Sequence, residues 1–502
     1  MNGEYVVVMD CGSTNITVTA VRPNGEIVAT SSTPNSPVQQ EDGEEGWLVF
    51  DMEPLWQKIS SCTREVCDEV GAENVKAVTL TTWGADGAPV DADGYLTYPP
   101  ICWQCPRTEQ TAKEVSEKVG ARRLFDITGY QVITFNTLFR LIWLRQNAPG
   151  ALDKAEQWLM MPGLLSYKLS GQKSIDATSA STMMAMDLKN RTWSEELLAE
   201  AGLDPSFFPE MVYPGEVIGE VTNEASAQTG LKAGTPVVAA GHDTQFAPIG
   251  SGATRDEAIL SSGTWEILMA RAPQFQANDV GFSEGLIIEQ DAVRDLYDPQ
   301  LLMMGSGVLE WVREKMFSEV EDRETAYETM VEEARGVKAG ADGVTMVPSF
   351  VPDTGPTKKF NTKGTLTGLT LSSTRGHVYR ATLEGLTFQM KDALRILESA
   401  TGFSADSIRV VGGGARNPLW NRIRADVSQM PVTVTREKEA TVLGASVAAW
   451  VGAGKFSSFE EGQEALDIDT TVIEPSENAE EYQELFEEYK SLPPTLQDFY
   501  SE

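Results

Sequence analysis

Residues 237–269, VVAAGHDTQFAPIGSGATRDEAILSSGTWEILM, decide the fold of this chain because they place two kinds of polar group a short distance apart. A run of β-branched and small residues over 236–240 ends at Gly241 and predicts a buried strand that delivers His242, Asp243 and Thr244 at its carboxyl end. Open α/β sheets place their ligands at that end. Two apolar runs over 258–270 are joined by Ser-Ser-Gly-Thr at 261–264 and predict a hairpin whose backbone N–H groups can approach an anion.

A carboxylate near an anion-binding hairpin indicates that the chemistry of this site is phosphoryl transfer. In that chemistry the protein mainly positions the reactants, neutralises charge and removes a proton from the attacking hydroxyl. Asp243 is the candidate base, and Gly263 and Thr264 can hold phosphate oxygens without adding negative charge. The competing interpretation is that Asp243 caps a following helix, since Asp is a favoured N-cap residue. This stretch alone does not decide between the two.

The N-terminal segment has the same design. A strand predicted over 5–9 runs into Asp-Cys-Gly-Ser-Thr-Asn at 10–15, and a second strand is predicted over 16–21. Asn24 and Gly25 predict a tight turn before a strand over 26–30. We interpret this hairpin and the later one as one device used twice. The alternative is a plain hairpin, because Asp, Gly, Ser and Thr are also common turn residues.

A glycine triplet at 412–414 is the third candidate ligand-binding feature. It follows an apolar strand predicted over 408–411 and precedes a helical segment predicted over 418–428. This setting favours close approach of the backbone to a ligand. A bare glycine turn is the alternative.

Composition limits the classes of partner. A chain of 502 residues predicts two or more domains. Its 40 basic and 74 acidic residues give a net charge of −34, which argues against nucleic acid and anionic membranes as partners. The acidic excess also fits a salt-rich cytoplasm, where screening limits self-repulsion to less than about 10 Å.

The cysteines and the apolar runs bear on location. We expect no signal peptide or membrane span, because the apolar run over 5–9 is short and Glu4 precedes it. Five cysteines, an odd number, indicate a reducing cytosol, so a cytoplasmic location is predicted. Cys102 and Cys105 have C-x-x-C spacing, but without a second pair zinc or redox chemistry there is the minor alternative.

Three further motifs add a family resemblance. They are FNTLFRLIWLRQN at 135–147, GTLTGLTLSSTRGHVYRATLE at 364–384 and VVGGGARN at 410–417. Together with the two hairpins, they resemble the actin-like ATPase superfamily and, within it, the FGGY carbohydrate kinases, over about residues 5–455. The first motif departs from the family at Arg140, where a lysine is usual. The resemblance implies an α/β protein of two actin-like (ribonuclease H-like) domains with the active site in the cleft between them.

The motifs also predict the domain organisation. Residues 1–242 are expected to form an N-terminal domain, with helical patterns over 108–169 covering its sheet, and residues 243–455 a C-terminal domain with a helix over 306–319. Residues 456–502 are expected to form an acidic tail with a helix over 479–492. Tyr482, Leu485, Phe486 and Tyr489 recur there at helical spacing and would pack the tail against the body.

The resemblance also implies roles for individual residues. Asp243 matches the base that deprotonates the sugar hydroxyl, and Asp10 matches the carboxylate that faces Mg²⁺, partly through water, and the phosphates. Phosphate and nucleotide contacts are implied for Asp10, Gly12, Ser13, Thr14, Asn15, Gly263, Thr264, Gly307, Glu310, Gly412, Gly413, Gly414 and Asn417. Sugar contacts are implied for Gly84, Asp86, Trp103, Arg107, His242, Asp243 and Thr244.

Some of these residues have an alternative interpretation. Trp83, Trp103 and Arg107 can frame a sugar, but a tryptophan in an apolar segment is more often part of the core. Glu310 and Thr17 stand where glycerol kinase-like members of the family have a glutamine and a phosphate-binding arginine. His377, at the start of a predicted helix, is more often structural.

The stretches TTWGADG (81–87), CWQCPRT (102–108), GHDTQFA (241–247), SSGTWEILM (261–269) and SGVLEWVR (306–313) are most similar to the family members that act on L-fuculose. This resemblance implies transfer of phosphate from ATP, with Mg²⁺, to the primary hydroxyl of a ketose. L-Rhamnulose, L-xylulose and D-ribulose are alternative substrates. A non-catalytic sugar sensor and an actin-like chaperone ATPase are alternatives of another class, and a homodimer is left open.

Overall fold

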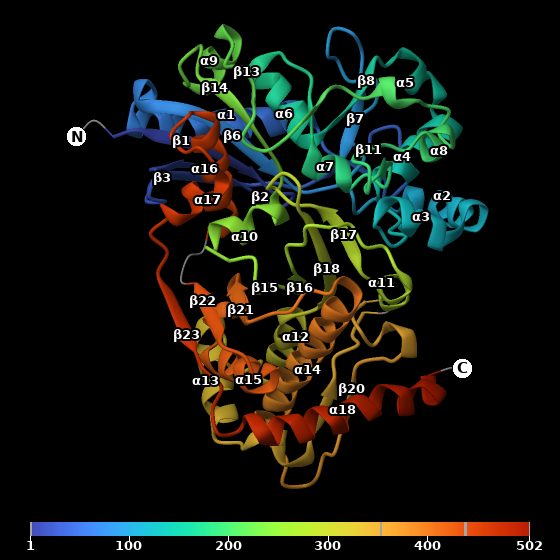
Figure 1. The fold of residues 1–502 in the computed structure, drawn as a ribbon, viewed down its shortest axis with the longest axis vertical. Helices are drawn as coiled ribbons and strands as arrows, with labels where there is room; N and C mark the ends of the chain where they lie inside the picture. Colours follow the sequence, from blue (N-terminus) through green and yellow to red (C-terminus); the bar gives the residue numbers. More distant parts are fainter. Residues whose placement is uncertain (1–2, 352–353, 436–438, 501–502) are drawn as a thin grey trace.

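The computed structural model describes residues 3–351, 354–435 and 439–500, and it contains two large sheets, one in each half of the molecule (Figure 1). The six-stranded first sheet has the order β13 (Val217–Glu220), β14 (Pro236–His242), β6 (Val75–Thr82), β1 (Tyr5–Cys11), β2 (Asn15–Val21) and β3 (Ile27–Pro34). The seven-stranded second sheet has the order β17 (Ile287–Gln290), β18 (Tyr297–Met304), β16 (Trp265–Met269), β15 (Glu257–Ser262), β21 (Ser407–Val411), β22 (Val432–Thr435) and β23 (Thr470–Ile473).

The two sheets repeat one arrangement. In the first, the antiparallel strands β1, β2 and β3 are continued by β6 and β14, which run parallel to β1. In the second, the antiparallel strands β15, β16 and β18 are continued in the same way by β21 and β22. This repetition confirms the predicted α/β fold and the two predicted hairpins, although β1 runs on through Asp10 to Cys11.

Helices cover both faces of the first sheet. Val7 and Met9 of β1 lie in one core with α1 (Met52–Val70) and α6 (Met161–Ser170). Val6 and Val8, which point to the other face because strand side chains alternate, lie in a second core with α16 (Ala440–Gly452). Burial on both faces explains why β1 is an almost continuous apolar run.

The predicted helices over 108–169 do not cover the sheet as expected, because only α6 packs on it. α4 is buried along residues 137–144 and packs in a separate core with its neighbours, so their apolar surface is already used. The other elements of this region are α2 (Glu109–Val115), α3 (Ala121–Thr128), α4 (Thr137–Asn147), α5 (Pro149–Lys154) and β8 (Gln157–Met160), and the elements on either side of it are β7 (Gly87–Val90), α7 (Ala177–Ser181) and α8 (Glu195–Ala199).

The second half is built around α14 (Arg375–Thr401), which packs against α12 (Ser306–Met316), α13 (Arg323–Arg335) and α15 (Pro418–Ser428). α18 (Ala479–Tyr500) packs on this half through Tyr482, Phe486 and Tyr489, which confirms the predicted packing of the tail. α18 continues past the predicted end at 492, and the buried ring of Pro493 lies within it.

The chain crosses between the halves more than once. α10 (Ala247–Gly250), α16 and α17 (Phe459–Glu464) contribute to the core on the first sheet, although the first two fall within the predicted second domain. The boundaries at 242 and 455 stay a prediction, because the packing does not follow the chain order at these helices.

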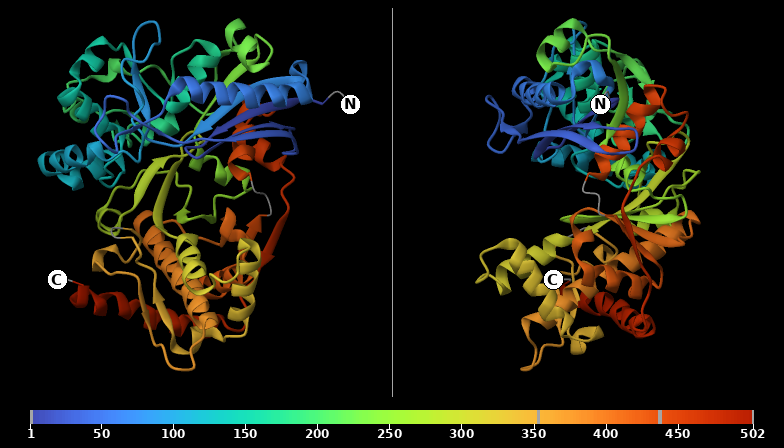
Figure 2. Two further views of the ribbon diagram at one scale, coloured as in Figure 1. Left: turned by 180° about the vertical axis from the view of Figure 1, so that it is seen from behind. Right: turned by 90° about the vertical axis from the view of Figure 1, so that its left-hand side faces the viewer.

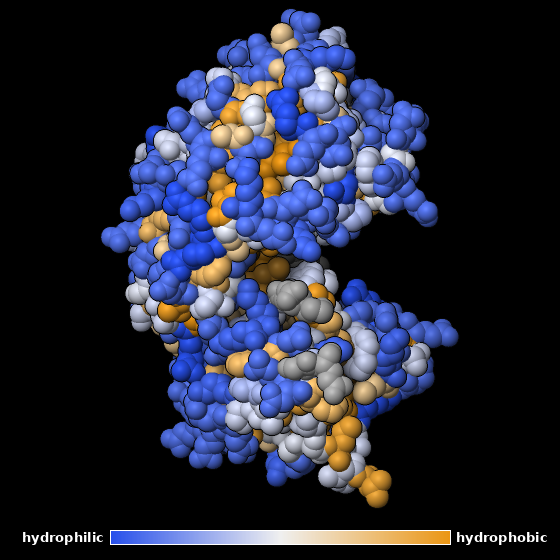
Figure 3. Space-filling view, turned by 90° about the vertical axis from the view of Figure 1, so that its right-hand side faces the viewer, coloured by the Kyte–Doolittle hydropathy of each residue, from blue (hydrophilic) through white to orange (hydrophobic). Residues whose placement is uncertain are grey.

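Short elements complete the fold: β4 (Val38–Gln39), β5 (Leu48–Val49), β9 (Ile175–Asp176), β10 (Met186–Asp187), β11 (Thr192–Trp193), β12 (Met211–Val212), β19 (Thr345–Val347), β20 (Thr365–Thr367), α9 (Asn223–Thr229) and α11 (Asp279–Glu284). Figure 2 shows the two halves from two further sides, and the space-filling view in Figure 3 shows the molecule hollowed between them. Among the described residues, no helix combines the length and apolar character needed to cross a membrane.

Candidate active site

Three parallel strands of the first sheet bring the predicted carboxylates together at the carboxyl ends of the strands. Asp10 of β1 lies opposite Thr81 of β6, whose hydroxyl donates to its Oδ1 at 2.9 Å. Thr81 in turn lies opposite Gly241 of β14, and Asp243 follows at the end of that strand, in the short helix η5 (Asp243–Gln245). Because neighbouring strands are only about 4.8 Å apart, the two predicted carboxylates lie at the same end of the sheet, where these strands finish.

Asp243 does not cap the following helix. The residues at the cap positions of η5 and α10 are His242 and Phe246, and neither makes a side-chain cap. The Asp243 carboxylate instead accepts the N–H of Thr244 at 2.7 Å and its hydroxyl at 3.3 Å. About a third of the Asp243 side chain is exposed, so a carboxylate oxygen is accessible to a ligand.

Burial opposes ionisation of both carboxylates, and nearby negative charges add to this effect. Burial, together with the negative charge of Asp243, raises the pKa of Asp10 to about 7. Burial also raises the pKa of Asp243 above its usual value, whereas the neighbouring His242 acts in the opposite direction. A cation placed between the two carboxylates would therefore be favoured electrostatically.

His242 links the first sheet to the second. Its Nδ1 lies 3.1 Å from Oε2 of Glu289, a buried residue of β17, and its Nε2 lies 3.5 Å from Oδ1 of Asp243. Glu289 also accepts hydrogen bonds from the Tyr130 hydroxyl and from Nε2 of Gln245, the latter at 2.7 Å. The sequence analysis missed Glu289, Tyr130 and Gln245, because they come from three separate stretches that carry no motif of their own.

Two glycines allow close packing around His242, Gly241 beside Asp176 and Gly84 beside the imidazole itself. The backbone of Gly241 has φ +140°, and a Cβ there would lie 1.9 Å from Oδ1 of Asp176. A Cβ at Gly84 would lie 3.0 Å from Nε2 of His242, so the imidazole occupies the space beside Gly84. The structure thus brings Gly84, His242 and Asp243 together, and Thr244 follows directly.

Asp86, which was predicted to contact the sugar, is completely buried in the structure. Its Oδ1 lies 2.7 Å from Nη1 of Arg140, and its Oδ2 accepts the backbone N–H of Trp103 at 3.2 Å. Arg140 also donates to the carbonyl of Ala85 at 2.6 Å. The Asp86–Arg140 pair therefore holds the loop that carries Gly84 and the backbone of Trp103 in position.

Arg107, which was also predicted to contact the sugar, is buried as well. Its guanidinium is buried near the rings of Trp47 and Trp143 and donates to Gln40 at 2.8 Å. Trp103 differs, since its indole is 37% exposed, with one edge against Phe135.

Trp83 belongs to the core. Its ring lies 4.5 Å from that of Phe50, centroid to centroid, in the core of the first sheet. Of the aromatic and arginine side chains expected to frame a sugar, Trp103 is thus the exposed one.

The turn of the first hairpin is held by a residue that the sequence analysis missed. The backbone N–H of Asn35 donates to the carbonyl of Thr14 at 2.9 Å, and its side-chain amide donates to the carbonyl of Gly12 at 3.0 Å. With these carbonyls occupied, the turn presents Thr14 and Asn15 as exposed residues, and Ser13 is half-buried.

The second hairpin is held by the start of α12. The N–H of Ser306 donates to the carbonyl of Gly263 at 2.8 Å, and the N–H of Gly307 donates to the carbonyl of Thr264 at 3.1 Å. A Cβ at Gly307 would lie 3.3 Å from the same carbonyl oxygen. In both hairpins these carbonyls therefore accept hydrogen bonds from other parts of the protein. The exposed threonine, Thr14 or Thr264, lies at the tip of its hairpin.

The glycine triplet lies directly on the second hairpin. Gly412 has φ +86°, and a Cβ there would lie 2.8 Å from the carbonyl oxygen of Ser262. A Cβ at Gly414 would lie 2.0 Å from Oγ of Ser262. Gly413 differs, because a Cβ there would meet nothing nearer than Arg416 at 3.8 Å. Packing therefore explains two of the glycines, and Gly413 is left as the position where a ligand can approach the backbone.

A buried ion pair behind this hairpin was also missed. Arg424 of α15 forms an ion pair with Glu266 of β16, and its Nη2 donates to Oγ of Ser262 at 2.7 Å. Its Nη1 donates to Asn421 at 2.9 Å. Arg424 thus joins the helix after the glycine triplet to both strands of the hairpin. Asn417, at the start of the same helix, accepts the N–H of Trp420 at 3.1 Å.

Glu310 of α12 is already paired. It forms ion pairs with Arg313 at 2.7 Å and with Arg323 at 3.2 Å, and it accepts the hydroxyl of Tyr327 at 2.7 Å. Although burial alone acts in the other direction, these partners lower the pKa of Glu310 to about 2. The geometry gives Glu310 a structural role on α12.

His377 and the C-x-x-C pair have structural surroundings. His377 is part of a capping box with Thr374 at the start of α14, which confirms the structural interpretation. Cys102 and Cys105 are free and buried. Within the described residues, no group of three or more His, Cys, Asp or Glu side chains is arranged to hold a metal ion, so no zinc site is indicated at the pair.

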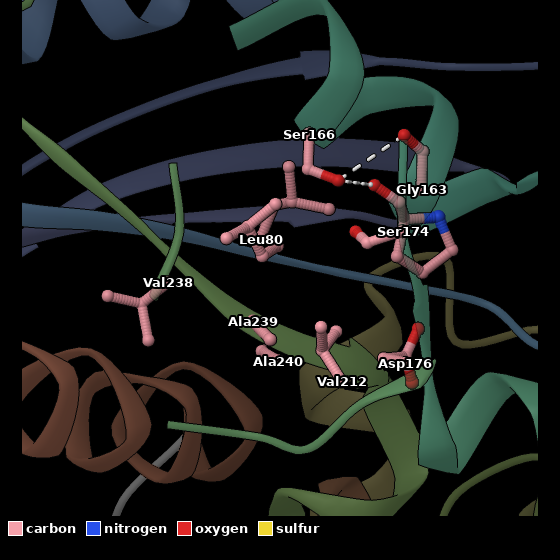
Figure 4. A pocket seen from close by; sticks show the side chains of 11 residues that line it. Leu80, Gly163, Ser166, Ser174, Asp176, Val212, Val238, Ala239 and Ala240 are labelled. Atoms are coloured by element: carbon pink, nitrogen blue, oxygen red, sulfur yellow. Dashed lines mark hydrogen bonds between the residues drawn. The ribbon is translucent and has the colours of Figure 1, made fainter. Parts of the chain in front are cut away.

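A small enclosed cavity lies away from these residues. It is found between α6, β6 and β14, and Figure 4 shows Leu80, Ser166 and Asp176 among its walls. The hydroxyl of Ser166 donates to the carbonyl of Pro162 at 2.7 Å, so its hydrogen is already used within α6. None of the predicted site residues lines this cavity.

The donor set at Asp10 fits Mg²⁺. Mg²⁺ usually keeps several waters and is held by one or two carboxylates together with substrate phosphates. Asp10 offers one such carboxylate, and the proximity of Asp243 makes the position electrostatically favourable for a cation. The Mg²⁺ ion would be held partly through water and by phosphate oxygens.

Comparisons with known proteins agree with this geometry. The model of the FGGY family of carbohydrate kinases, N-terminal domain, matches residues 5–250, and that of its C-terminal domain matches residues 258–453. The chain is 39% identical to the L-fuculokinase of Escherichia coli (strain K12) over 97% of its length and 100% of that protein. It is 34% identical to the L-fuculokinase of Haemophilus influenzae over 94% of its length and 99% of that protein.

A solved structure supports the fold. The xylulose kinase from Rhodospirillum rubrum, 24% identical, superimposes with a TM-score of 0.89 and covers 99% of this chain and 100% of that one. Both halves of the family and nearly the full length of its members are therefore present. The chain belongs to the FGGY family of carbohydrate kinases and is a phosphotransferase.

Proposed function

We propose that the protein transfers phosphate from ATP to L-fuculose, giving L-fuculose 1-phosphate, with Asp243 as the general base. The observation that carries this proposal is the partly exposed Asp243 carboxylate, which shares a sheet edge with Asp10 and is not used as a helix cap. The similarity to L-fuculokinases supports the choice of sugar.

In the proposed reaction, each group of side chains has a separate role. Asp243 accepts the proton of the primary hydroxyl as that oxygen attacks the terminal phosphorus in line with the leaving ADP. Thr14 and Thr264, with the backbone of Gly12, Ser13, Asn15 and Gly263, hold the phosphate oxygens from the two hairpins. Asp10 orients Mg²⁺, which, when bound, neutralises the charge that develops on those oxygens.

The substrates divide between the halves in this proposal. Gly84, Trp103, His242 and Thr244 surround the sugar, while Asp86 and Arg107 support that wall from within the core. Gly413 approaches the nucleotide, and Gly307, Gly412, Gly414 and Asn417 fix the surrounding backbone. Glu310 stabilises α12 and does not need to touch the nucleotide. A cytoplasmic location and a homodimer remain predictions.

Membership of a kinase family removes the sugar sensor and the chaperone ATPase from the alternatives. Another ketose remains the competing substrate, and L-xylulose, L-rhamnulose and D-ribulose are the candidates. The xylulose kinase of Rhodospirillum rubrum shares the fold, and at 24% identity that likeness does not distinguish one ketose from another.

A panel of ketoses tests the proposal. ADP release is measured with Mg²⁺ and ATP for L-fuculose, L-rhamnulose, L-xylulose and D-ribulose, and the product is identified by phosphorus NMR. Correct positioning is worth about 7 kcal/mol or more of a barrier, so L-fuculose should stimulate ADP release by orders of magnitude, with one phosphate on C1 per ADP. Stronger stimulation by another ketose would reassign the substrate, and ADP release that ignores every sugar would contradict the kinase mechanism.

A further inference from the structure

Glu289 reaches the proposed base from the other half of the molecule. It lies in β17 at the edge of the second sheet, whereas His242 and Asp243 end β14 of the first sheet. β17 is held against the first half by its backbone, since the N–H of Ile288 donates to the carbonyl of Gly129 at 2.8 Å. The approach of Glu289 to His242 is therefore fixed by the fold.

The surroundings of Glu289 favour its ionised form. The residue is 3% exposed, and its carboxyl group accepts hydrogen bonds from Tyr130 and Gln245 and lies beside Nδ1 of His242. A carboxylate accepts hydrogen bonds at both oxygens, while a protonated carboxyl loses part of that capacity. Although burial alone has the opposite effect, these partners hold the pKa of Glu289 below its usual value.

Acidic groups face His242 from each element packed around it. They are Glu289 from β17, Asp243 from η5 and Asp176 from β9. No basic side chain is among the groups that act on this imidazole in the described part of the chain. Although burial alone lowers it, these carboxylates raise the pKa of His242 to about 9.

We propose that Glu289 is a positioning residue for phosphoryl transfer, which holds His242 as an imidazolium beside Asp243 and so keeps the base ionised. The inference rests on the proposed role of Asp243. Burial opposes a charge on Asp243, and the more distant charge of Glu289 adds to this, whereas the imidazolium of His242, 3.5 Å away, favours the ionised form. The second half of the molecule thereby sets the protonation state of a base carried by the first.

The charge of His242 is directly measurable, because the chain has only two histidines. His377→Gln removes the other imidazole, which lies in the capping box of α14 and outside the proposed site. In this background, an NMR titration of the remaining imidazole should show it protonated beyond pH 8. Glu289→Gln should move the midpoint down by at least one pH unit, since a neighbouring charge shifts a pKa by about 1–3 units. A midpoint near the ordinary value of about 6.5 with Glu289 present, or one that Glu289→Gln leaves unchanged, would overturn the proposal.

The pH dependence of turnover tests the effect on the base. Since Asp243 must be ionised to accept a proton, loss of the imidazolium above the lowered His242 midpoint should move the alkaline limb of kcat/KM for the ketose to lower pH in Glu289→Gln. Glu257→Gln is the matched control, because Glu257 is also a buried carboxylate of the second sheet, 2.9 Å from Arg409. The control should keep the alkaline limb of the unmodified protein, and Glu289→Asp should restore part of the shift.

Two results would count against the inference. A uniform loss of rate at every pH in Glu289→Gln would indicate a structural role only, and an equal shift in Glu257→Gln would indicate a general effect of lost charge. If the unmodified protein phosphorylates no ketose, the proposed function is wrong, and the NMR titration still decides whether Glu289 sets the charge of His242.

Discussion

Asp243 is the residue on which the proposed mechanism depends most directly. Asp243→Asn keeps the shape of the side chain and the hydrogen bond from Thr244, but it removes the proton acceptor. We expect kcat to fall by at least about 10²-fold, the usual effect of losing a general base. Steady-state kinetics gives kcat, and calorimetry should show that the variant still binds the ketose.

Asp86→Asn provides a contrast to this variant. It removes a carboxylate that is buried against Arg140, so it should lower the melting temperature as well as the rate. An Asp243→Asn variant with near-normal turnover would contradict the role of the base.

The ionised form of Asp10 destabilises the fold of the ligand-free protein. Burial and the charge of Asp243 raise its pKa from 3.8 to about 7. A carboxyl whose pKa is higher in the folded chain stabilises the fold below its unfolded pKa, and that contribution is lost as the pH rises through the folded pKa. The loss therefore falls between about pH 4 and pH 7. Asp10→Asn should melt at a higher temperature than the unmodified protein at pH 8, and the difference should shrink at pH 5.

The same variant should lose productive use of Mg²⁺ and ATP while it still binds the sugar. Thermal denaturation at the two pH values, without ligands, separates the electrostatic effect from binding. A gain in stability of equal size at both values would show that the charge of Asp10 is not its cause.

At the scale of elements, the glycine triplet separates packing from ligand contact. Gly414→Ala would place a methyl group 2.0 Å from Oγ of Ser262, while Gly413→Ala makes only an ordinary contact with Arg416 at 3.8 Å. We expect Gly414→Ala to lower the melting temperature by several degrees, because a destabilisation of about 1 kcal/mol shifts it by about 2–4 °C in a large domain. Gly413→Ala should keep the melting temperature and raise the KM for ATP. Equal stability losses in both variants would contradict this division.

The elements show what the sequence could predict. Both hairpins were predictable because their strands are short apolar runs and their turns are built from Gly, Ser and Thr, which are local signals. The packing of α18 was predictable from Tyr482, Phe486 and Tyr489 at helical spacing, but its end was not, because burial of Pro493 outweighs the usual helix break. The helices over 108–169 were placed on the wrong surface, since amphipathic spacing does not say which neighbour covers the apolar face.

In the active site, the sequence also predicts positions next to strands but not contacts between distant parts of the chain. Asp10 lies near the end of β1, and Asp243 and the glycine triplet directly follow strands, so their position at the carboxyl ends of the strands could be predicted from the chain. Glu289 reaches His242 across 47 positions of the sequence, and Arg424 reaches Ser262 across 162. No local pattern marks either contact. Asp86 and Arg107 were assigned to the sugar because their residue types suit it, and the structure buries both.

At the scale of the whole molecule, the two halves are joined along one side. β17 of the second half is bonded to the first through Gly129, and α16 returns from the second half to cover the first sheet. These connections are part of buried cores, so they resist separation. The hollow between the halves in Figure 3 is the part that motion can narrow.

We expect the halves to close when both substrates are bound. In the proposed division the sugar contacts the first half and the nucleotide the second, and closure would exclude water from the phosphoryl group. Small-angle scattering should give a smaller radius of gyration with L-fuculose and a non-hydrolysable ATP analogue together than with either ligand alone. Gly413→Ala should require more analogue for the same change, because it weakens nucleotide binding without altering the fold. Tight binding of both ligands with no change in size would mean that the hollow is a fixed feature and that water is excluded by the side chains at the sheet edge alone.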